Sequence, residues 1–297
     1  MTPLIFGGNG QLAKSLQLQF SRENIDFFSL SKNDIDISKP DMITYSLKKF
    51  SPTIVINLAA YTAVDYAESN IDLAYEVNAI GCQNLAINCS LLKIPLIHLS
   101  TDYVFDGASD KPYKPSDSPN PINIYGASKL KGEELIQEHS NEYTILRTSG
   151  VYGEFGNNFL KTMLNLIQKS KEIRVISDQL TTPTYSGDLA FAISRICFAY
   201  HAGRLENQIY HYGGPKILSW FDFTKEILLH IHDSKPHLNL PVLIPIHSKN
   251  FYSAATRPMF SALDSSKLSA KYNLPEVEIS DRIKSTINKI LVNDLVG

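Results

Sequence analysis

The first half of the chain alternates between short apolar runs and amphipathic stretches. Residues 53–58 and 95–100 are rich in apolar and β-branched side chains, as is typical of strands buried on both faces of a parallel sheet. Apolar positions at helical spacing occupy residues 12–20 and recur at residues 42–50 and 71–92. This alternation predicts an α/β fold in which a doubly wound parallel sheet is covered by helices on both faces.

The pattern becomes less regular after residue 150, and prolines at positions 236, 241, 245 and 258 interrupt it. We therefore expect a main domain at residues 1–150 and a smaller, interleaved lobe at residues 151–297, some segments of which return to the sheet. The predicted strands lie at residues 4–6, 25–30, 53–58, 95–100, 144–147, 173–177 and 208–212. The predicted helices lie at residues 12–20, 42–50, 71–92, 125–139, 158–170, 189–200, 220–232 and 279–291.

Composition and charge narrow the functional class. The 297 residues include 28 Lys and Arg against 30 Asp and Glu, a formal net charge of −2, whereas sequence-blind nucleic-acid binding needs a basic surface. No apolar run reaches the ~18 residues of a membrane span, and an early glycine cluster does not fit a signal peptide. The three cysteines form no CxxC motif, so we expect neither a disulfide scaffold nor a structural zinc site. We also predict that the protein binds no metal. We expect a cytoplasmic protein that binds neither nucleic acid nor a membrane.

A glycine loop joins the first predicted strand to the first predicted helix. Gly7, Gly10 and Ala13 have the spacing G-x-x-G-x-x-A. Glycine permits a tight turn and a close approach of backbone to a pyrophosphate, and the following helix N-terminus offers free N–H groups. The alternative is a turn that needs glycine for its conformation alone. The strand–loop–helix context favours a dinucleotide site, so that residues 1–150 would mainly be an NAD(P)-binding Rossmann-type domain and residues 151–297 mainly a substrate-binding lobe.

The end of the second predicted strand bears on the choice of cofactor. An acidic residue at this point commonly binds the ribose 2′-hydroxyl of NAD. Here the chain has Ser31 and Lys32, and the first acids are Asp34 and Asp36. A hydroxyl and a cation suit a 2′-phosphate, so we expect NADPH to be preferred over NADH. The alternative for Lys32 is an ordinary solvated loop lysine.

A tyrosine and a lysine lie four residues apart at the start of a predicted helix. Tyr125 and Lys129 would share one helical face, and an ammonium beside the phenol would lower its pKa from about 10 toward the working range of an acid or base. Thr101 lies at the carboxyl end of a predicted strand, where open α/β sheets bind their ligands, and it could donate to a substrate oxygen. Alone, such a Tyr-Lys pair is usually an ordinary exposed pair. Together with the glycine loop and the polar strand end at Thr101, it favours a functional site over an ordinary exposed pair.

At these residues the sequence resembles the extended short-chain dehydrogenase/reductases and, more narrowly, the dTDP-4-dehydrorhamnose reductase family. The matching stretches lie in family order over nearly the whole chain. They are GGNGQL at 7–12, NLAAYTAVD at 57–65, STDYVFDG at 100–107, YGASKLKGE at 125–133, RTS at 147–149, GNNF at 156–159, DQ at 178–179, PT at 183–184 and RP at 257–258.

The resemblance implies NAD(P)H-dependent reduction of the C4 keto group of a nucleotide-diphospho-4-keto-6-deoxy sugar, in deoxysugar or cell-surface polysaccharide biosynthesis. Thr101, Tyr125 and Lys129 would be catalytic, with Tyr125 as the proton donor and Lys129 also holding the nicotinamide ribose. The other cofactor-binding residues would be Gly7, Gly10, Gln11, Leu12, Ser31, Lys32, Asp36, Ile37, Ala59, Ala60, Tyr61 and Asn78. The substrate-binding residues would be Thr101, Tyr103, Gly150 and Arg257. A homodimer is a further expectation.

One position departs from the family pattern. The family has the motif Arg-Thr-Ser-Trp, whereas the corresponding residues here are Arg-Thr-Ser at 147–149 followed by Gly150. The only tryptophan, Trp220, lies elsewhere in the sequence. A glycine predicts room for a bulkier sugar, unless another aromatic side chain such as Tyr103 or Phe155 fills the space. Two alternatives stay open: a non-catalytic NADP-binding regulatory subunit on the same fold, and a nucleotide-sugar epimerase. Dehydration is disfavoured because Tyr103 stands where dehydratases have a glutamate.

Overall fold

The structure, a computed structural model, describes residues 1–203, 207–234 and 236–293. Its centre is a six-stranded sheet in the order β10-β5-β4-β3-β1-β2, with every neighbouring pair parallel. The strands are β1 (Pro3–Phe6), β2 (Phe28–Leu30), β3 (Ile54–Asn57), β4 (Leu96–Thr101), β5 (Tyr143–Thr148) and β10 (Gln208–Tyr212). The strand order reverses between β1 and β3, which confirms the predicted doubly wound fold and places a ligand crevice at the carboxyl ends of these strands.

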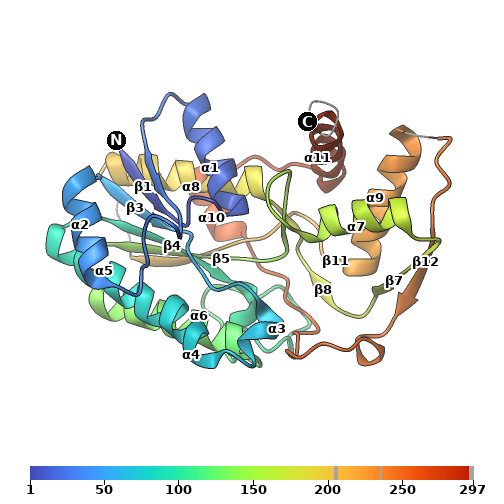
Figure 1. Cartoon of the computed structure of the whole chain (residues 1–297), viewed down its shortest axis with the longest axis horizontal. Helices are drawn as coiled ribbons and strands as arrows, with labels where there is room; N and C mark the ends of the chain where they lie inside the picture. The colour runs from blue at the N-terminus through green and yellow to red at the C-terminus, as the bar shows by residue number, and fades with distance from the viewer. Residues whose placement is uncertain (204–206, 235, 294–297) are drawn as a thin grey trace.

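Helices cover both faces of this sheet (Figure 1). On one face, Leu16 and Ile193 belong to a core that also contains Ile5 of β1, whereas Leu47 and Leu85 pack with the neighbouring β1 side chains on the other face. The helices of the first face are α1 (Gln11–Arg22), α8 (Ser186–His201) and α10 (Ser266–Tyr272). Those of the second face are α2 (Pro40–Phe50), α5 (Gly81–Leu92) and α6 (Ile124–His139). Because successive side chains of a strand point to opposite faces, a strand covered on both sides is apolar throughout.

The long helix predicted at residues 71–92 contains a π-helical turn. Its parts are α4 (Ile71–Tyr75), the π turn η1 (Glu76–Ile80) and α5. The buried Asn78 lies in this turn. π turns within α-helices are rare and are frequent at functional sites. The predicted helical span of residues 71–92 is confirmed, whereas the apolar spacing did not reveal the π turn within it.

The C-terminal lobe has its own apolar core, to the right in Figure 1. Its helices are α7 (Phe159–Lys169), α9 (Trp220–Ser234) and α11 (Ile279–Asn293). Its short strands pair two by two: β7 (Glu172–Ile176) with β12 (Val242–Ile246), β8 (Leu180–Thr181) with β11 (Leu218–Ser219), and β6 (Val151–Tyr152) with β9 (Thr184–Tyr185). The chain leaves this lobe to form α8 and β10, so the lobe is interleaved with the sheet domain as predicted.

Several boundaries differ from the prediction. The second strand begins at Phe28 instead of residue 25, and β12 was not predicted because Pro245 lies within it. A proline is tolerated there because β12 belongs to a two-stranded sheet and needs only one neighbour. The remaining short elements are α3 (Val64–Ala67), η2 (Asp102–Val104) and η3 (Ser248–Asn250). Within the described ranges, no helix combines the length and apolar character needed to cross a membrane.

Candidate active site

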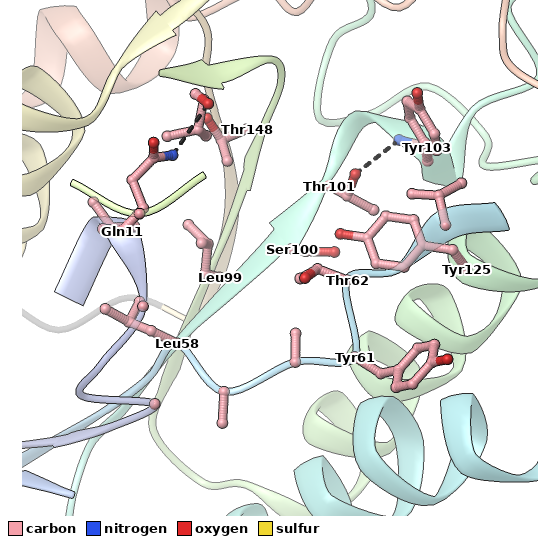
Figure 2. A pocket seen from close by; sticks show the side chains of 18 of the residues that line it. Gln11, Leu58, Tyr61, Thr62, Leu99, Ser100, Thr101, Tyr103, Tyr125 and Thr148 are labelled. Atoms are coloured by element: carbon pink, nitrogen blue, oxygen red, sulfur yellow. Dashed lines mark hydrogen bonds between the residues drawn. The ribbon is translucent and has the colours of Figure 1, made fainter. Parts of the chain in front are cut away.

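A cavity of about 830 Å³ lies at the carboxyl ends of β1, β3, β4 and β5, between the sheet and the C-terminal lobe. Figure 2 shows the side chains that surround it, with Gln11 and Leu58 facing Tyr125 from the opposite side. Most of the predicted site residues line this cavity: Gly7, Gly10, Gln11, Leu12, Ser31, Lys32, Asp36, Ile37, Ala59, Ala60, Tyr61, Thr101, Tyr103, Tyr125 and Gly150. Three of them do not: Asn78, Lys129 and Arg257.

The glycine loop has the geometry that a pyrophosphate needs. Gly7 has φ +87°, and a Cβ there would lie 2.6 Å from the backbone nitrogen of Ala59, so no other residue fits without movement. Gly10 is the N-cap residue of α1, so no side chain caps the free N–H groups of this helix. The first turn of α1 also contains no acidic residue. The N–H groups at this helix end therefore face the cavity without an internal anion to neutralise their positive dipole end. This cradle fits the phosphates of a dinucleotide.

Gln11 connects this loop to the C-terminal lobe. Its side-chain amide donates to the carbonyl of Val151 at 3.1 Å, and its Oε1 accepts from Asn158 Nδ2 at 2.6 Å. Asn158 also caps α7 by accepting from the backbone N–H of Lys161 at 3.1 Å. These hydrogen bonds connect the glycine loop, which would hold the cofactor, to α7, the first helix of the C-terminal lobe.

At the far end of the cavity, Ser31 and Lys32 follow β2 as predicted. The Ser31 hydroxyl donates to Asp34 Oδ2 at 2.6 Å, and this hydrogen bond, with a second from the Ser31 backbone, lowers the pKa of Asp34. Lys32 makes no ion pair with any residue in the described part of the chain, whereas Asp36 accepts from the backbone N–H of Ser38 at 2.9 Å. A lysine that forms no ion pair within the described residues fits a 2′-phosphate at this position, although its charge also helps to lower the pKa of Asp36.

Tyr125 enters the cavity from the first turn of α6. The helix is capped by Asn123, whose side chain accepts from the backbone N–H of Gly126 at 2.8 Å. A Cβ on Gly126 would lie 2.0 Å from the Tyr103 carbonyl oxygen, so glycine lets α6 approach η2 closely. Figure 2 shows the Tyr125 hydroxyl pointing toward Ser100 and Thr101, with Tyr103 above the Tyr125 ring in this view. The two tyrosine rings meet edge to face, with centroids 5.8 Å apart.

The electrostatics of this group differ from the prediction. Burial raises the pKa of Tyr125 to about 12, a Thr101 hydrogen bond opposes this, and the Asp102 carboxylate adds to it. The Lys129 amine instead donates to the Leu99 carbonyl at 2.7 Å and contacts His98 Nε2 at 3.1 Å. The prediction that Lys129 lowers the phenol pKa is therefore wrong in this structure, because the amine is directed at β4. A phenol that stays protonated is suited to donate a proton.

Asp102 is a second titratable group beside the reacting centre. It is buried and lines the cavity, and its Oδ1 accepts from the Thr101 hydroxyl at 3.1 Å. Burial raises the pKa of this carboxyl to about 7, although hydrogen bonds from Ser261 and Thr101 oppose the shift. Thr101 also accepts from the backbone N–H of Tyr103 at 3.2 Å, which fixes the hydroxyl between the carboxyl and the cavity.

Asn78 and Arg257 do not line the cavity, but each makes contacts with residues of the segment after β3. Asn78 Oδ1 accepts from the backbone N–H of Tyr61 at 2.8 Å, and its Nδ2 donates to the Tyr61 carbonyl at 3.1 Å. It thereby holds the segment after β3 that carries Ala60 and Tyr61. Arg257 pairs with Asp65 at 2.6 Å, which leaves its predicted contact with the nucleotide a prediction.

Two hydroxyls that the sequence analysis did not select also line the cavity. Ser100 Oγ and Thr148 Oγ1 are buried and have no hydrogen-bond partner within the described part of the chain. An unpartnered buried hydroxyl costs free energy, so such groups are retained where a ligand completes them. Both lie at the carboxyl ends of neighbouring strands, β4 and β5. Strand-end position was the signal that could have identified them.

The space beside Gly150 is filled by Trp220. A Cβ at Gly150, which has φ +53°, would lie 3.5 Å from Trp220 Cη2 and 3.4 Å from Pro183 Cα. Trp220 begins α9, lines the cavity and packs against Phe159 with ring centroids 4.6 Å apart. Another aromatic side chain thus fills the space beside Gly150, but it is Trp220 and not Tyr103 or Phe155 as considered from the sequence, because the fold brings α9 to the end of β5. Tyr103 lines the cavity elsewhere, and Phe155 does not line it.

Comparison with known proteins agrees with this architecture. The model of the family described as RmlD substrate binding domain matches residues 1–292. The chain is 38% identical over 273 residues to dTDP-4-dehydrorhamnose reductase of Aggregatibacter actinomycetemcomitans, covering 91% of this chain and 93% of the relative. It is 36% identical over 260 residues to the spore coat polysaccharide biosynthesis protein SpsK of Bacillus subtilis, covering 88% of each.

Solved structures give the same result. The crystal structure of dTDP-4-dehydrorhamnose reductase from Bacillus anthracis in complex with NADP matches with a TM-score of 0.88 and 36% identity, over 97% of this chain and 99% of that one. UDP-glucose 4-epimerase from Thermus thermophilus matches with a TM-score of 0.81 at 19% identity, over 98% and 99% of the two chains, which shows a shared fold alone. The family prediction is confirmed: the chain belongs to the dTDP-4-dehydrorhamnose reductase family and is an enzyme of the NAD(P)H-dependent sugar reductase class.

Proposed function

We propose that this protein reduces the C4 keto group of a dTDP-linked 4-keto-6-deoxy sugar with NADPH, in the biosynthesis of a deoxysugar for a cell-surface polysaccharide. The observation that carries the proposal is the protonated Tyr125 hydroxyl, which shares one cavity with the glycine loop and with Thr101. The bound nicotinamide would supply the hydride. Tyr125 would give its proton to the C4 oxygen, and Thr101 would orient that oxygen.

The two halves of the cavity would divide the binding. Residues 1–150 would mainly bind the cofactor, through the glycine loop and the segments after β2 and β3. Residues 151–297 would mainly bind the substrate, with Trp220 as the aromatic wall. Ser100 and Thr148 lie between the two halves and offer hydroxyls to either ligand.

A turnover assay tests this function. The protein would be incubated with NADPH and dTDP-4-dehydrorhamnose, and the loss of NADPH absorbance would be followed while NMR identifies the alcohol formed at C4. Stoichiometric NADPH consumption is expected. An epimerase would interconvert C4 isomers without net NADPH consumption, and a regulatory subunit would bind NADPH without turnover. GDP-, CDP- and UDP-linked 4-keto sugars would serve as competing substrates and identify the base.

A homodimer is supported by one exposed apolar stripe. Ile80, Ile87 and Leu91 are 44%, 37% and 76% exposed and follow one another at spacings of seven and four residues from the end of the π turn along α5. Such spacing puts side chains on one helical face, which a second copy of the chain could cover. Sedimentation equilibrium would then give a dimer, and Leu91→Lys would give a monomer. We also place the protein in the cytoplasm, where NADPH and nucleotide sugars are made.

A further inference from the structure

The hydroxyl of Thr101 has more partners than its single proton can serve. Its oxygen accepts from the backbone N–H of Tyr103 at 3.2 Å, the dashed line beside Thr101 in Figure 2, and its proton is donated to Asp102 Oδ1 at 3.1 Å. A hydroxyl has one O–H donor and two acceptor lone pairs. While Asp102 takes the proton, Thr101 therefore presents only a lone pair to the cavity.

A keto oxygen cannot use that lone pair. A carbonyl oxygen accepts hydrogen bonds and donates none, so two acceptors would face each other if the C4 oxygen approached Thr101 in this state. The Thr101 hydroxyl can orient the C4 oxygen only when its proton is free of Asp102.

A protonated Asp102 removes this conflict. A carboxylic acid has an O–H donor, which would fill one lone pair of Thr101, while the N–H of Tyr103 fills the other. The Thr101 proton is then free for the substrate. We propose that Asp102 is a positioning residue that turns the Thr101 hydroxyl: the carboxylate holds the proton of Thr101 away from the substrate, and the carboxylic acid leaves it free for the C4 oxygen. This inference rests on the proposed function, in which Thr101 binds that oxygen.

The surroundings of Asp102 allow both of its forms near neutral pH. The side chain is 4% exposed, and burial raises its pKa to about 7, although hydrogen bonds from Ser261 and Thr101 oppose the shift. Ser261 is itself buried and lines the cavity. Its hydroxyl can donate to Asp102 in either form, because a carboxylic acid keeps an acceptor oxygen. Only the hydrogen bond with Thr101 has to reverse.

Two phenols and two cations belong to the segments packed around Asp102. The phenols are Tyr103 of η2 and Tyr125 of α6, and burial raises the pKa of each, so both stay protonated at neutral pH. The cations are directed elsewhere: Lys129 of α6 donates to a carbonyl of β4 at 2.7 Å, and Arg257 pairs with the carboxylate of α3 at 2.6 Å. Burial is thus the main influence on the charge of Asp102, and Tyr125 remains a proton donor in either state of that group.

The pH profile of reduction tests the proposal. With saturating NADPH and a 4-keto sugar as the varied substrate, kcat/KM of the wild type should be about tenfold lower at pH 8 than at pH 6, the change in protonated fraction of a group with a pKa of about 7. Asp102→Asn should change less than about twofold over this range, because an amide N–H can donate to Thr101 at every pH. Asp106→Asn is the matched control: it removes a carboxylate four residues away that does not line the cavity, and it should keep the wild-type profile. Equal profiles for wild type and Asp102→Asn would overturn the proposal.

Thr101→Val tests whether Asp102 acts through Thr101. Valine has nearly the same shape and no hydroxyl, so kcat/KM should fall roughly 10²-fold or more, as for a lost donor to the reacting oxygen. The remaining activity should no longer decline between pH 6 and pH 8, and adding Asp102→Asn should change it little. A tenfold decline that persists in Thr101→Val would show that Asp102 acts by another route and would overturn the proposal.

Carbon-13 NMR of the full-length protein with bound NADPH measures the state of Asp102 without any substrate. In protein labelled at the aspartate carboxyl carbon, the Asp102 signal should titrate near pH 7. Asp102→Asn assigns the signal by removing it, and Thr101→Val assigns it by a shift if the first variant does not fold. An Asp102 that titrates near pH 7 in a protein that consumes no NADPH would disprove the proposed function, whereas turnover with a fully ionised Asp102 at pH 6 would disprove this inference alone.

Discussion

Replacing Trp220 by alanine tests whether α9 supplies the aromatic wall of the substrate site. Trp220 lines the cavity next to Gly150, and its other neighbour is the ring of Phe159. A buried tryptophan covers ~150–250 Å², and if roughly one third of that lies against the sugar, the loss is about 1.3–2 kcal/mol at ~25 cal/mol per Å². Trp220→Ala should therefore weaken substrate binding roughly 10- to 30-fold.

The assay separates this effect from a general loss of stability. Calorimetry would give Kd for the nucleotide sugar and for NADPH, steady-state kinetics would give kcat/KM, and thermal unfolding would give Tm. Phe221→Ala is the matched control, because Phe221 is the next residue of α9 and packs against the lobe core without lining the cavity. It should lower Tm and leave the substrate Kd unchanged. Equal substrate affinity for wild type and Trp220→Ala would refute the reasoning.

A double variant strengthens the test. A tryptophan at position 150 would collide with Trp220, because even a Cβ there lies 3.5 Å from the indole, and φ +53° is unfavourable for any side chain. Gly150→Trp alone should weaken substrate binding. Gly150→Trp combined with Trp220→Ala should recover part of the affinity, since one indole then occupies the shared space. Additive losses would mean that the two positions do not share one space.

Three further predictions concern the cofactor, the acid and pH. Lys32→Glu should reverse a preference for NADPH over NADH, measured by calorimetry, because it replaces the cation that we expect to face the 2′-phosphate of NADPH. Wild-type protein that binds NADH equally well would contradict this. Tyr125→Phe should lower turnover by at least ~10²-fold with NADPH affinity nearly unchanged, the range of a lost general acid, and near-normal turnover would exclude the assigned role. Because burial raises the pKa of Asp102 to about 7, the folded protein holds a proton that the unfolded chain releases at lower pH. Stability from this group is therefore lost as pH rises toward 7, by roughly 3 kcal/mol between pH 5 and pH 8. Asp102→Asn should reduce this loss in urea unfolding at the two pH values, and an unchanged difference would show that Asp102 is ionised at both.

The features that sequence predicted well are those set by neighbours along the chain. Gly7 and Gly10 follow a strand and precede a helix, and strand ends in a parallel sheet meet at one edge, so the position of Thr101 followed from its strand alone. The period of apolar residues likewise predicted helices on both faces of the sheet. These inferences need only local geometry and the rule that parallel strands share their direction.

Features that depend on packing between distant segments were not predictable in this way. Trp220 lies 70 positions after Gly150 in the sequence, and only the fold of the lobe brings its ring to that glycine. Lys129 lies on the predicted face of α6, but whether its amine points at Tyr125 or at His98 depends on β4, which contributes both the Leu99 carbonyl and the imidazole. A helical spacing specifies a face and leaves the partner on the next element undetermined.

The high pKa of Tyr125 is compatible with its role as an acid because the proton acceptor changes during the reaction. A ketone oxygen is a very weak base, whereas the alkoxide that forms as hydride reaches C4 is a stronger base than a phenolate. A phenol with a pKa of about 12 therefore stays protonated at neutral pH and releases its proton only as the alkoxide develops. The Asp102 carboxyl works in the same direction, since its negative charge raises the phenol pKa and so favours the return of a proton to Tyr125 after each turnover. Burial and the neighbouring Asp102 carboxylate thus both favour the protonated form of Tyr125, which is the form that reduction of a ketone needs.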